Sequence, residues 1–327
     1  MNKKGISIII CCYNSESRLP KTLEYLSQQT ISKDIPVELI IVNNASTDNT
    51  KEVALKEWNK YSCHFSFQII DEEKPGQMFA RKRGAQEAQY EYVLFCDDDN
   101  WLQSDYLQIA FDLMESDDKI GALGGQSIAV SEIDFPDWFP EFAEGYAVGK
   151  QLEESGDISK KGLLWGAGMV ARNSLLNKVF NSKYPMLIDG RTEGKLISGD
   201  DSEICKRILL LGYSLYYDNS LLFYHNISPN RLTLEYKNRL WEGFDISWKI
   251  LVKYEFVYIE MKKSRKDRMR DISYSFKRIL KTKGEAKKYW KTKLLVRIGL
   301  LLKMYFVSND LEYRKILKFY LGNTKNK

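Results

Sequence analysis

Three consecutive carboxylates, Asp97, Asp98 and Asp99, follow the apolar segment "YVLFC". Carboxylates this close raise one another's pKa and destabilise a fold unless a cation or hydrogen-bond donors compensate their charge. The apolar, β-prone segment before them predicts a buried strand, and Asp97 and Asp99, two residues apart, would point the same way in an extended continuation of it. Oxygen ligands of this kind suit Mg²⁺ or Mn²⁺. The pattern therefore indicates a metal site, and the alternative is an acidic turn exposed to solvent.

A second acidic pair, Asp200 and Asp201, precedes the segment "SEICKRILLLGY", whose apolar spacing predicts a helix that ends at Gly212. The Gly-rich segment over residues 189–201 is expected to form a mobile loop before this helix. A carboxylate placed here can act as a general base, which typically raises a reaction rate by roughly 10²–10⁴-fold. The alternative is that one of the two carboxylates only caps the helix.

The elements that must position these carboxylates alternate between strand and helix. Strands are predicted over residues 5–12, 37–43, 64–70 and 92–96, and helices over residues 19–29, 47–58, 76–88 and 104–114, the last with Ser104 as its N-cap. This alternation predicts an α/β fold with a mostly parallel sheet and helices on both faces. Ligands of such sheets bind beyond the carboxyl ends of the strands. Three of these ends are polar and should converge on one crevice: "CCYNSES", "VNNASTDNT" and "CDDDN".

The pattern becomes less regular after residue 120. Residues 163–176 predict a Gly-containing strand that runs into a helix, and residues 214–226 predict two short strands. From about residue 230 the chain is rich in Lys, Arg, Tyr and Trp and is expected to be helical.

The composition is that of a globular protein, with 44% hydrophobic and 28% charged residues in 327. Five cysteines without a Cys-x-x-Cys pair indicate buried thiols in a reducing compartment rather than a disulfide framework or a zinc site. The first apolar run, residues 6–12, is too short for a signal peptide. No run of about 18 apolar residues is present, so no transmembrane helix is expected. These features together predict a cytoplasmic protein.

The charge is divided unevenly along the chain. Residues 231–327 contain 26 Lys+Arg and 10 Asp+Glu, a net charge of +16, and the remaining 23 Lys+Arg and 34 Asp+Glu give residues 1–230 a net charge of −11. We therefore expect a boundary that separates residues 1–229 from a basic, mostly helical region over residues 230–327. Such asymmetry indicates an anionic partner for the basic region, either membrane lipid or nucleic acid.

Six motifs resemble, in order and spacing, those of the family 2 glycosyltransferases: "SIIICCYN", "ELIIVNNASTDNT", "GQMFARKRGA", "FCDDDN", "LWGAGMVARNSLL" and "GDDSEICKRILLLGY". The resemblance covers residues 5–228 and implies the Rossmann-like GT-A fold, a nucleotide-sugar donor, a divalent cation and inversion at the anomeric carbon. The donor-binding residues that it implies are Tyr13, Asn14, Asn43, Asn44, Ser46, Gly76, Arg81, Asp97 and Asp98.

The resemblance also assigns roles to the two acidic motifs. Asp99 is expected to be the direct ligand of Mn²⁺ or Mg²⁺, with Asp97 as a further ligand, because a cation stabilises the departing diphosphate. Asp201 is expected to be the general base, with Asp200 beside it. His225, at the end of "LLFYH", matches a metal ligand of some family members, although a lone histidine is more often structural.

Two positions depart from the family pattern. Asn43 and Asn44 replace an aspartate that contacts the nucleobase, and an amide can still form hydrogen bonds with a pyrimidine edge. Asp200-Asp201 replaces the usual Glu-Asp pair, which shortens one side chain.

Further residues have two interpretations. Arg81 could contact the donor's diphosphate or be a solvated charge on a helix. Trp138, Phe139 and Trp165 could form a wall on which a sugar of the acceptor stacks, although aromatic clusters are more often part of a core.

The basic region also has more than one interpretation. Its apolar residues between 294 and 305 follow helical spacing and are interrupted by Arg297 and Lys303, which predicts a helix that lies on a membrane rather than crossing it. The alternatives are a helical bundle packed on the catalytic domain and an oligomer interface. Nucleic-acid binding is not expected, because no recognised module accompanies the charge.

The function expected from these features is metal-dependent, inverting transfer of a sugar from a nucleotide-diphosphate donor, such as a UDP-sugar, to a polysaccharide or lipid-linked glycan of the cell envelope. The protein would then act peripherally at the inner face of the cell membrane. One rival is a haloacid-dehalogenase-type phosphatase, which shares an Asp-x-Asp motif, but Trp101 stands where that class has Thr or Val. The second rival is a non-catalytic scaffold that binds sugar nucleotides.

Overall fold

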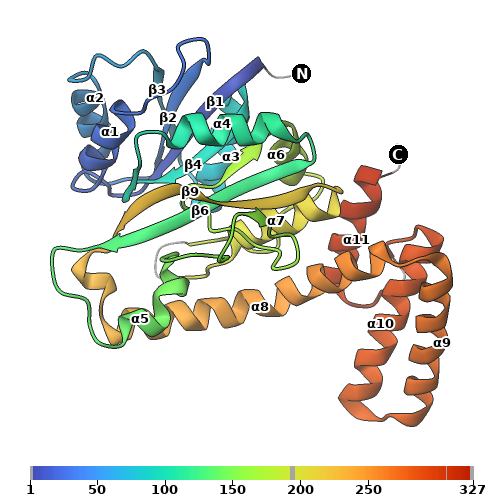
Figure 1. The fold of residues 1–327 in the computed structure, drawn as a ribbon. Coiled ribbons are helices and arrows are strands. Elements are labelled where there is room, and N and C mark those ends of the chain that lie inside the picture. The colour runs from blue at the N-terminus through green and yellow to red at the C-terminus, as the bar shows by residue number, and fades with distance from the viewer. Residues whose placement is uncertain (1–2, 192–195, 307, 325–327) are drawn as a thin grey trace.

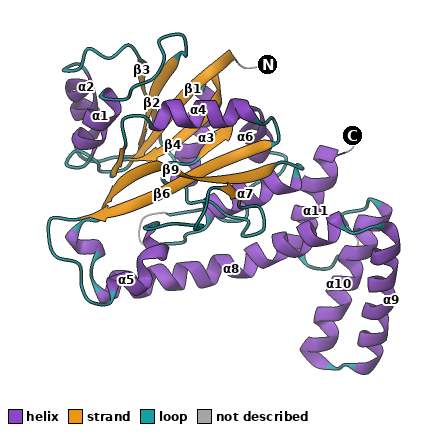
Figure 2. Ribbon diagram, viewed as in Figure 1, coloured by secondary structure: helices purple, strands orange, loops and turns teal. Residues whose placement is uncertain are grey.

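The structure is a computed structural model that describes residues 3–191, 196–306 and 308–324. Its first half alternates between strands and helices, as expected from the sequence (Figures 1 and 2). The elements of this half are β1 (Lys3–Cys12), α1 (Leu19–Ser27), β2 (Val37–Asn44), α2 (Thr50–Trp58), β3 (Ser66–Glu72), α3 (Gln77–Glu87), β4 (Tyr90–Asp97), β5 (Asn100–Leu102) and α4 (Tyr106–Ser116).

The second half adds shorter elements to the sheet and then continues as helices. These elements are β6 (Ile120–Val130), α5 (Phe139–Phe142), η1 (Ala143–Tyr146), β7 (Gly156–Asp157), β8 (Val170–Arg172), α6 (Asn173–Val179), α7 (Asp200–Leu210), β9 (Ser214–Asn226), η2 (Pro229–Arg231), α8 (Leu234–Lys262), α9 (Arg265–Lys281), α10 (Gly284–Leu302) and α11 (Leu311–Thr324).

The described strands form one sheet in the order β3-β2-β1-β4-β8-β6-β9-β5, with β7 paired to β9. The strands β1 to β4 are parallel, and so are β6 and β9, whereas β8 runs antiparallel to both β4 and β6. The parallel pairing brings the carboxyl ends of β1, β2 and β4 to the same edge. The predicted mostly parallel α/β sheet is confirmed.

Helices cover both faces of this sheet because its central strands are apolar on both sides. In β1, Ile8 packs in a cluster with α1, α2 and α4, and the next residue, Ile9, packs in a second cluster with α3, α6 and α7. Residues of α8, α10 and α11 extend the second cluster. The five cysteines are unpaired. Cys12, Cys96 and Cys205 are buried, as expected, whereas Cys11 and Cys63 are only partly buried.

Three local predictions were wrong. Residues 214–226 form one strand, β9, rather than two. The register between β9 and β6 shifts near Gly125, which lies against the backbone of Leu221, and β9 continues beyond this shift. The strand predicted from residue 163 is only β8, Val170–Arg172. Asp105 rather than Ser104 is the N-cap of α4, and it makes no side-chain capping bond.

The C-terminal helices include one long helix, α8, and a helical hairpin made by α9 and α10. The 29-residue helix α8 runs along one side of the sheet, and α9 and α10 form an antiparallel hairpin that projects from its far end (Figure 1). Arg297 of α10 is buried and pairs with Glu260 of α8 at 2.8 Å. The sequence had predicted that Arg297 interrupts an apolar stripe facing a membrane, and this prediction was wrong. Among the described helices, none is both long and apolar enough to cross a bilayer.

Candidate active site

Each of the three consecutive carboxylates faces one arginine from a different part of the chain. Arg18, just before α1, lies 2.6 Å from Asp98, Arg231 in η2 lies 2.8 Å from Asp99, and Arg81 in α3 lies 3.7 Å from Asp97. Asp98 and Asp99 are buried, which excludes the solvent-exposed acidic turn. The charge repulsion expected within the triplet is therefore compensated by guanidinium groups.

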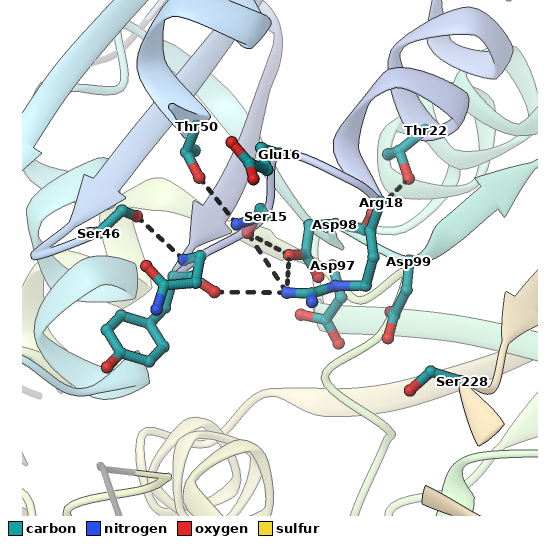
Figure 3. Close-up of polar contacts among 12 residues, drawn as sticks. Ser15, Glu16, Arg18, Thr22, Ser46, Thr50, Asp97, Asp98, Asp99 and Ser228 are labelled. Carbon is teal, nitrogen blue, oxygen red and sulfur yellow. Dashed lines mark hydrogen bonds and ion pairs between the residues drawn. The ribbon is translucent and has the colours of Figure 1, made fainter. Parts of the chain in front are cut away.

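The three side chains point in two directions. Asp98 is turned toward Ser15 and Arg18, whereas Asp97 and Asp99 point away from Ser15 (Figure 3). Burial, and then the negative charge of Asp99, raise the pKa of Asp98. Burial also acts to raise the pKa of Asp99, but the neighbouring His225 and the positive charge of Arg231 outweigh it and hold that pKa below its ordinary value. Asp98 is thus held by hydrogen bonds from Ser15 and Arg18, and Asp99 is kept ionised.

His225 lies next to Asp99 because β9 pairs with β5 just after the acidic turn. His225 Nε2 is 3.6 Å from Asp99 Oδ1 and 3.4 Å from Arg231 Nη1, and His225 Nδ1 is buried without a hydrogen-bond partner. In the described part of the chain, no group of three or more His, Cys, Asp or Glu is arranged to hold a metal ion. Mg²⁺-type ions are often held by one or two carboxylates and the phosphates of the substrate, so Asp99 and His225 fit a cation shared with a diphosphate.

The second acidic motif begins α7 and is joined to the first by Arg81. Gly199, with φ of 110°, is the N-cap, so Asp200 and Asp201 lie in the first turn and neither is the capping residue. Asp200 Oδ2 accepts a hydrogen bond from Arg81 Nη1 at 2.8 Å, and both side chains are buried. Arg81 is therefore not the solvated helix charge that was one of its two interpretations.

Asp201 is held by backbone donors. Its Oδ2 accepts from the Gly166 N–H at 2.8 Å and its Oδ1 from the Ser202 N–H at 2.6 Å. Burial and the adjacent charge of Asp200 raise the pKa of Asp201, while Arg81 acts to lower it. Gly166 has no room for a side chain, because a Cβ there would be 2.5 Å from Arg81 Nη2. The packing of the loop before β8 against Arg81 and the start of α7 thus fixes the position of this carboxylate.

A cavity of about 700 Å³ contains both acidic motifs. The sequence-predicted site residues that line this cavity are Arg81, Asp97, Asp98, Asp99, Trp165, Asp200, Asp201 and His225. Cys11 also lines it, and burial raises the pKa of this thiol to about 12, so the thiol stays protonated. The middle of the predicted mobile loop, residues 192–195, lies outside the described residues.

The predicted nucleotide-contacting turn lies beside this cavity and does not line it. Asn14, with φ of 50°, accepts from the Thr47 N–H, and its own N–H donates to Ser46 Oγ at 3.1 Å. These bonds hold the ends of β1 and β2 together. Tyr13 is exposed at the same edge.

The two asparagines that replace the family's aspartate have different environments. Asn44 is buried and bonds to the Glu72 and Lys74 carbonyls and the Gly76 N–H, so it fixes the loop before α3. Asn43 donates to Asp71 at 3.0 Å, and its Oδ1 has no partner. Asp71, opposite Asn43 in the β2–β3 register, is a carboxylate that the sequence reasoning missed, because only the strand pairing brings it to this edge.

The aromatic wall of the cavity differs from the predicted one. Trp138 and Phe139 pack in one aromatic cluster with Tyr146, Trp241 and Phe244. Neither Trp138 nor Phe139 is among the described residues that line the cavity, whereas the other three are. Trp165 is joined instead by Trp241, Phe244 and Trp248 of α8. The spacing of these three residues places them on one face of a helix, a signal that was present in the sequence but was assigned to the basic region.

The family model described as "Glycosyl transferase family 2" matches residues 7–180 of this chain. The chain belongs to glycosyl transferase family 2. This assignment confirms the family and the enzyme class expected from the motifs, and it leaves the phosphatase and scaffold alternatives without support.

Members of this family and solved GT-A structures are similar to the chain at low identity. Glycosyltransferase AglE of Haloferax volcanii is 26% identical over 239 residues, which cover 73% of this chain and 72% of AglE. The fold resembles residues 1–349 of S. aureus TarS in complex with UDP-GlcNAc, at 17% identity, a TM-score of 0.55, and coverage of 98% of this chain and 90% of that TarS fragment. It also resembles GalNAc-T7 with UDP, GalNAc and Mn²⁺, at 15% identity, a TM-score of 0.51, and coverage of 69% and 44%. The chain spans about a third of the length of several other curated relatives that it matches.

Proposed function

We propose that this family 2 glycosyltransferase moves a sugar from a UDP-sugar to a hydroxyl group of a glycan or lipid-linked glycan, with inversion at the anomeric carbon. The observation that carries this proposal is that both acidic motifs line one cavity and are joined by the buried Arg81. A carboxylate triplet alone would serve any cation-dependent reaction. A second carboxylate held by backbone donors in the same cavity adds the base that a transfer to a hydroxyl requires.

Asp201 is proposed as the general base. A buried carboxylate with a raised pKa is a stronger base once ionised, and the Gly166 and Ser202 N–H groups keep its oxygens in place. It would accept the proton from the acceptor hydroxyl as that oxygen attacks the anomeric carbon. The proposed base, Asp201, and the residues that would hold the leaving diphosphate are different parts of the cavity. We therefore propose a single displacement with inversion.

Asp99 and His225, with Asp97, would hold Mn²⁺ or Mg²⁺. When bound, the cation stabilises the negative charge that develops on the departing diphosphate. The uridine is proposed from the UDP-containing neighbours TarS and GalNAc-T7, with Asn43 and Asp71 at the edge where the base would bind. Tyr13, Asn14 and Ser46 would then border the nucleotide.

The acceptor is proposed to bind against Trp165, Trp241 and Trp248. Indole rings bind the apolar faces of sugar rings, and the carboxylates of Glu141, Glu144 and Asp245 in the same lining offer acceptors for sugar hydroxyls. Because α8 supplies part of this wall, the proposed catalytic domain over residues 1–229 is completed by the region over residues 230–327. Curated relatives include poly-β-1,6-N-acetyl-D-glucosamine synthases, which supports a polysaccharide acceptor of the cell envelope.

The hairpin of α9 and α10 is proposed to bind the anionic inner surface of the cell membrane. Met269, Phe276 and Leu280 lie on one face of α9, and each side chain is at least half exposed. Lys266, Lys277 and Lys281 on the same helix are also exposed. An apolar stripe between basic residues is the pattern of a helix that lies in a lipid interface. The membrane contact would therefore be α9 rather than the α10 stripe expected from the sequence.

The donor proposal is tested by calorimetric titration of UDP, GDP, CDP and dTDP with and without Mn²⁺. We expect UDP to bind in a Mn²⁺-dependent manner to the wild type and to lose that dependence in Asp99→Asn, which keeps the size of the side chain. Asp34→Ala, an exposed aspartate outside the cavity, is the matched control and should bind like the wild type. If no nucleotide binds with or without the metal, the proposed function is wrong.

A further inference from the structure

Arg231 forms an ion pair with Asp99, the carboxylate that the proposed cation would bind. Its Nη1 lies 2.8 Å from Asp99 Oδ2 and 3.4 Å from His225 Nε2, the two groups that would hold the metal. The guanidinium lines the cavity and is largely buried. A divalent cation on Asp99 would lie beside this positive charge, and like charges at such a distance repel strongly when they are shielded from water.

The guanidinium also has unused capacity for hydrogen bonds. An arginine carries five N–H donors in a planar fork, and Arg231 Nε is buried without a partner. The side chain also contacts Tyr236, whose ring centroid lies 5.7 Å from the guanidinium carbon and whose side chain interacts with it by a hydrogen bond. The fork matches phosphate oxygens, which it can bind with two parallel hydrogen bonds.

We propose that Arg231 exchanges partners during the binding of the donor. It pairs with Asp99 while the donor is absent, and it binds the diphosphate of the donor when the cation takes its place on Asp99. This inference rests on the proposed function and deepens it, because it makes Arg231 a donor-binding residue that also keeps the cation from binding strongly without a nucleotide.

The exchange predicts a coupling between the two ligands. Because Arg231 leaves Asp99 only when a diphosphate is present to receive it, UDP should strengthen the binding of Mn²⁺, and Mn²⁺ should strengthen the binding of UDP by the same factor. Removal of the guanidinium should change the two affinities in opposite directions. A residue that only supports the fold would weaken both.

The test measures Mn²⁺ binding from the free-ion electron paramagnetic resonance signal and UDP binding by calorimetry. In Arg231→Gln we expect Mn²⁺ without nucleotide to bind several-fold more tightly, and UDP in saturating Mn²⁺ to bind roughly ten- to hundredfold more weakly, the range for loss of charged hydrogen bonds. Arg231→Lys keeps a positive charge near Asp99 but loses the fork, so it should weaken UDP binding with little change in Mn²⁺ affinity.

Arg18→Gln is the matched control, because Arg18 pairs with the neighbouring Asp98 and is not among the described residues that line the cavity. It should tighten Mn²⁺ binding far less than Arg231→Gln does, because the charge of Arg18 acts on Asp99 less strongly than that of Arg231. Unchanged or weaker Mn²⁺ binding in Arg231→Gln would overturn the exchange, provided that the wild type binds UDP and the variant unfolds at the wild-type temperature. If Arg231→Gln does not fold, unchanged UDP affinity in Arg231→Lys would overturn it instead. Absence of UDP binding by the wild type would overturn the proposed function and this inference together.

Discussion

Arg81 of α3 and Asp200 of α7 form a buried ion pair with 2.8 Å between Nη1 and Oδ2. The two residues are 119 positions apart in the sequence, and the same guanidinium lies 3.7 Å from Asp97. One side chain therefore links the proposed donor site to the proposed base. Three consequences of this arrangement and one of the α9 surface can be measured.

Arg81→Met should lower the free energy of unfolding by about 3–5 kcal/mol, the usual effect of leaving a buried charge without its partner. Both Asp200 and Asp97 would lose their compensating charge. Urea denaturation measures the change. Arg83→Met is the control on the same helix, since Arg83 forms a largely exposed pair with Glu87 and should contribute no more than about 1 kcal/mol. Equal effects of the two substitutions would contradict the role of Arg81.

Asp201→Asn should reduce kcat for release of UDP from a UDP-sugar by roughly 10²–10⁴-fold, because the general base is lost. The Kd for UDP with Mn²⁺ should stay near that of the wild type, since Asp201 contacts Gly166 and Ser202 rather than the acidic triplet. Asp245→Asn removes another carboxylate of the same cavity and should have a much smaller effect. If Asp245→Asn is the inactive variant instead, Asp245 is the base.

The acid limb of the pH profile of kcat/KM should report the ionisation of Asp201. Burial and Asp200 raise the pKa of Asp201 above its ordinary value of 3.8, so activity should be lost as the pH falls through this raised value. Asp200→Asn removes the like charge and leaves Arg81 in place, so the limb should move to lower pH. A limb that stays in place in Asp200→Asn would show that a different group titrates.

Phe276→Ser combined with Leu280→Ser should weaken binding to vesicles of phosphatidylglycerol and phosphatidylcholine by at least about tenfold, because burial of each apolar side chain contributes roughly 1.5–3 kcal/mol. Added salt should weaken the wild-type binding, since screening reduces the attraction of the lysines to anionic lipid. Co-sedimentation measures both effects. Leu55→Ser combined with Ile133→Ser removes two half-exposed apolar residues outside the hairpin and should leave binding unchanged. Equal losses in the two double variants would argue against the hairpin as the lipid contact.

The sequence was sufficient for those parts of the site that follow a buried apolar strand. Continuous apolar runs identify β1, β2 and β4, and the polar residues after them must meet at one edge when the strands are parallel. Asp97 and Asp99 could therefore be found without the structure, whereas Asp201 lies in the first turn of α7 and was found from the resemblance of its motif to the family. The errors arose where long-range packing overrides the local pattern, as in β9, whose turn-like residues 218–220 lie within a continuous strand.

Residues that reach the site through tertiary contacts could not be predicted. Arg231 is an ordinary basic residue in the sequence, and only the pairing of β5 with β9 brings η2 beside Asp99. Trp241, Phe244 and Trp248 lie on a helix whose direction relative to the sheet has no local signal. The wall was therefore assigned to Trp138, which packs against Phe142 and Tyr146 of the wall and is not itself among the described lining residues.

Helix α8 has a consequence for the geometry of the whole enzyme. It contributes Trp241 and Trp248 to the cavity near one end, and Glu260 anchors the hairpin through Arg297 at the other. At about 1.5 Å per residue, α8 is a rigid spacer with a length of roughly 40 Å. It would set the height of the cavity above a lipid surface and the angle at which the cavity opens toward it. One residue added to its middle would turn the hairpin by about 100°, whereas seven would nearly restore the angle and only raise the cavity.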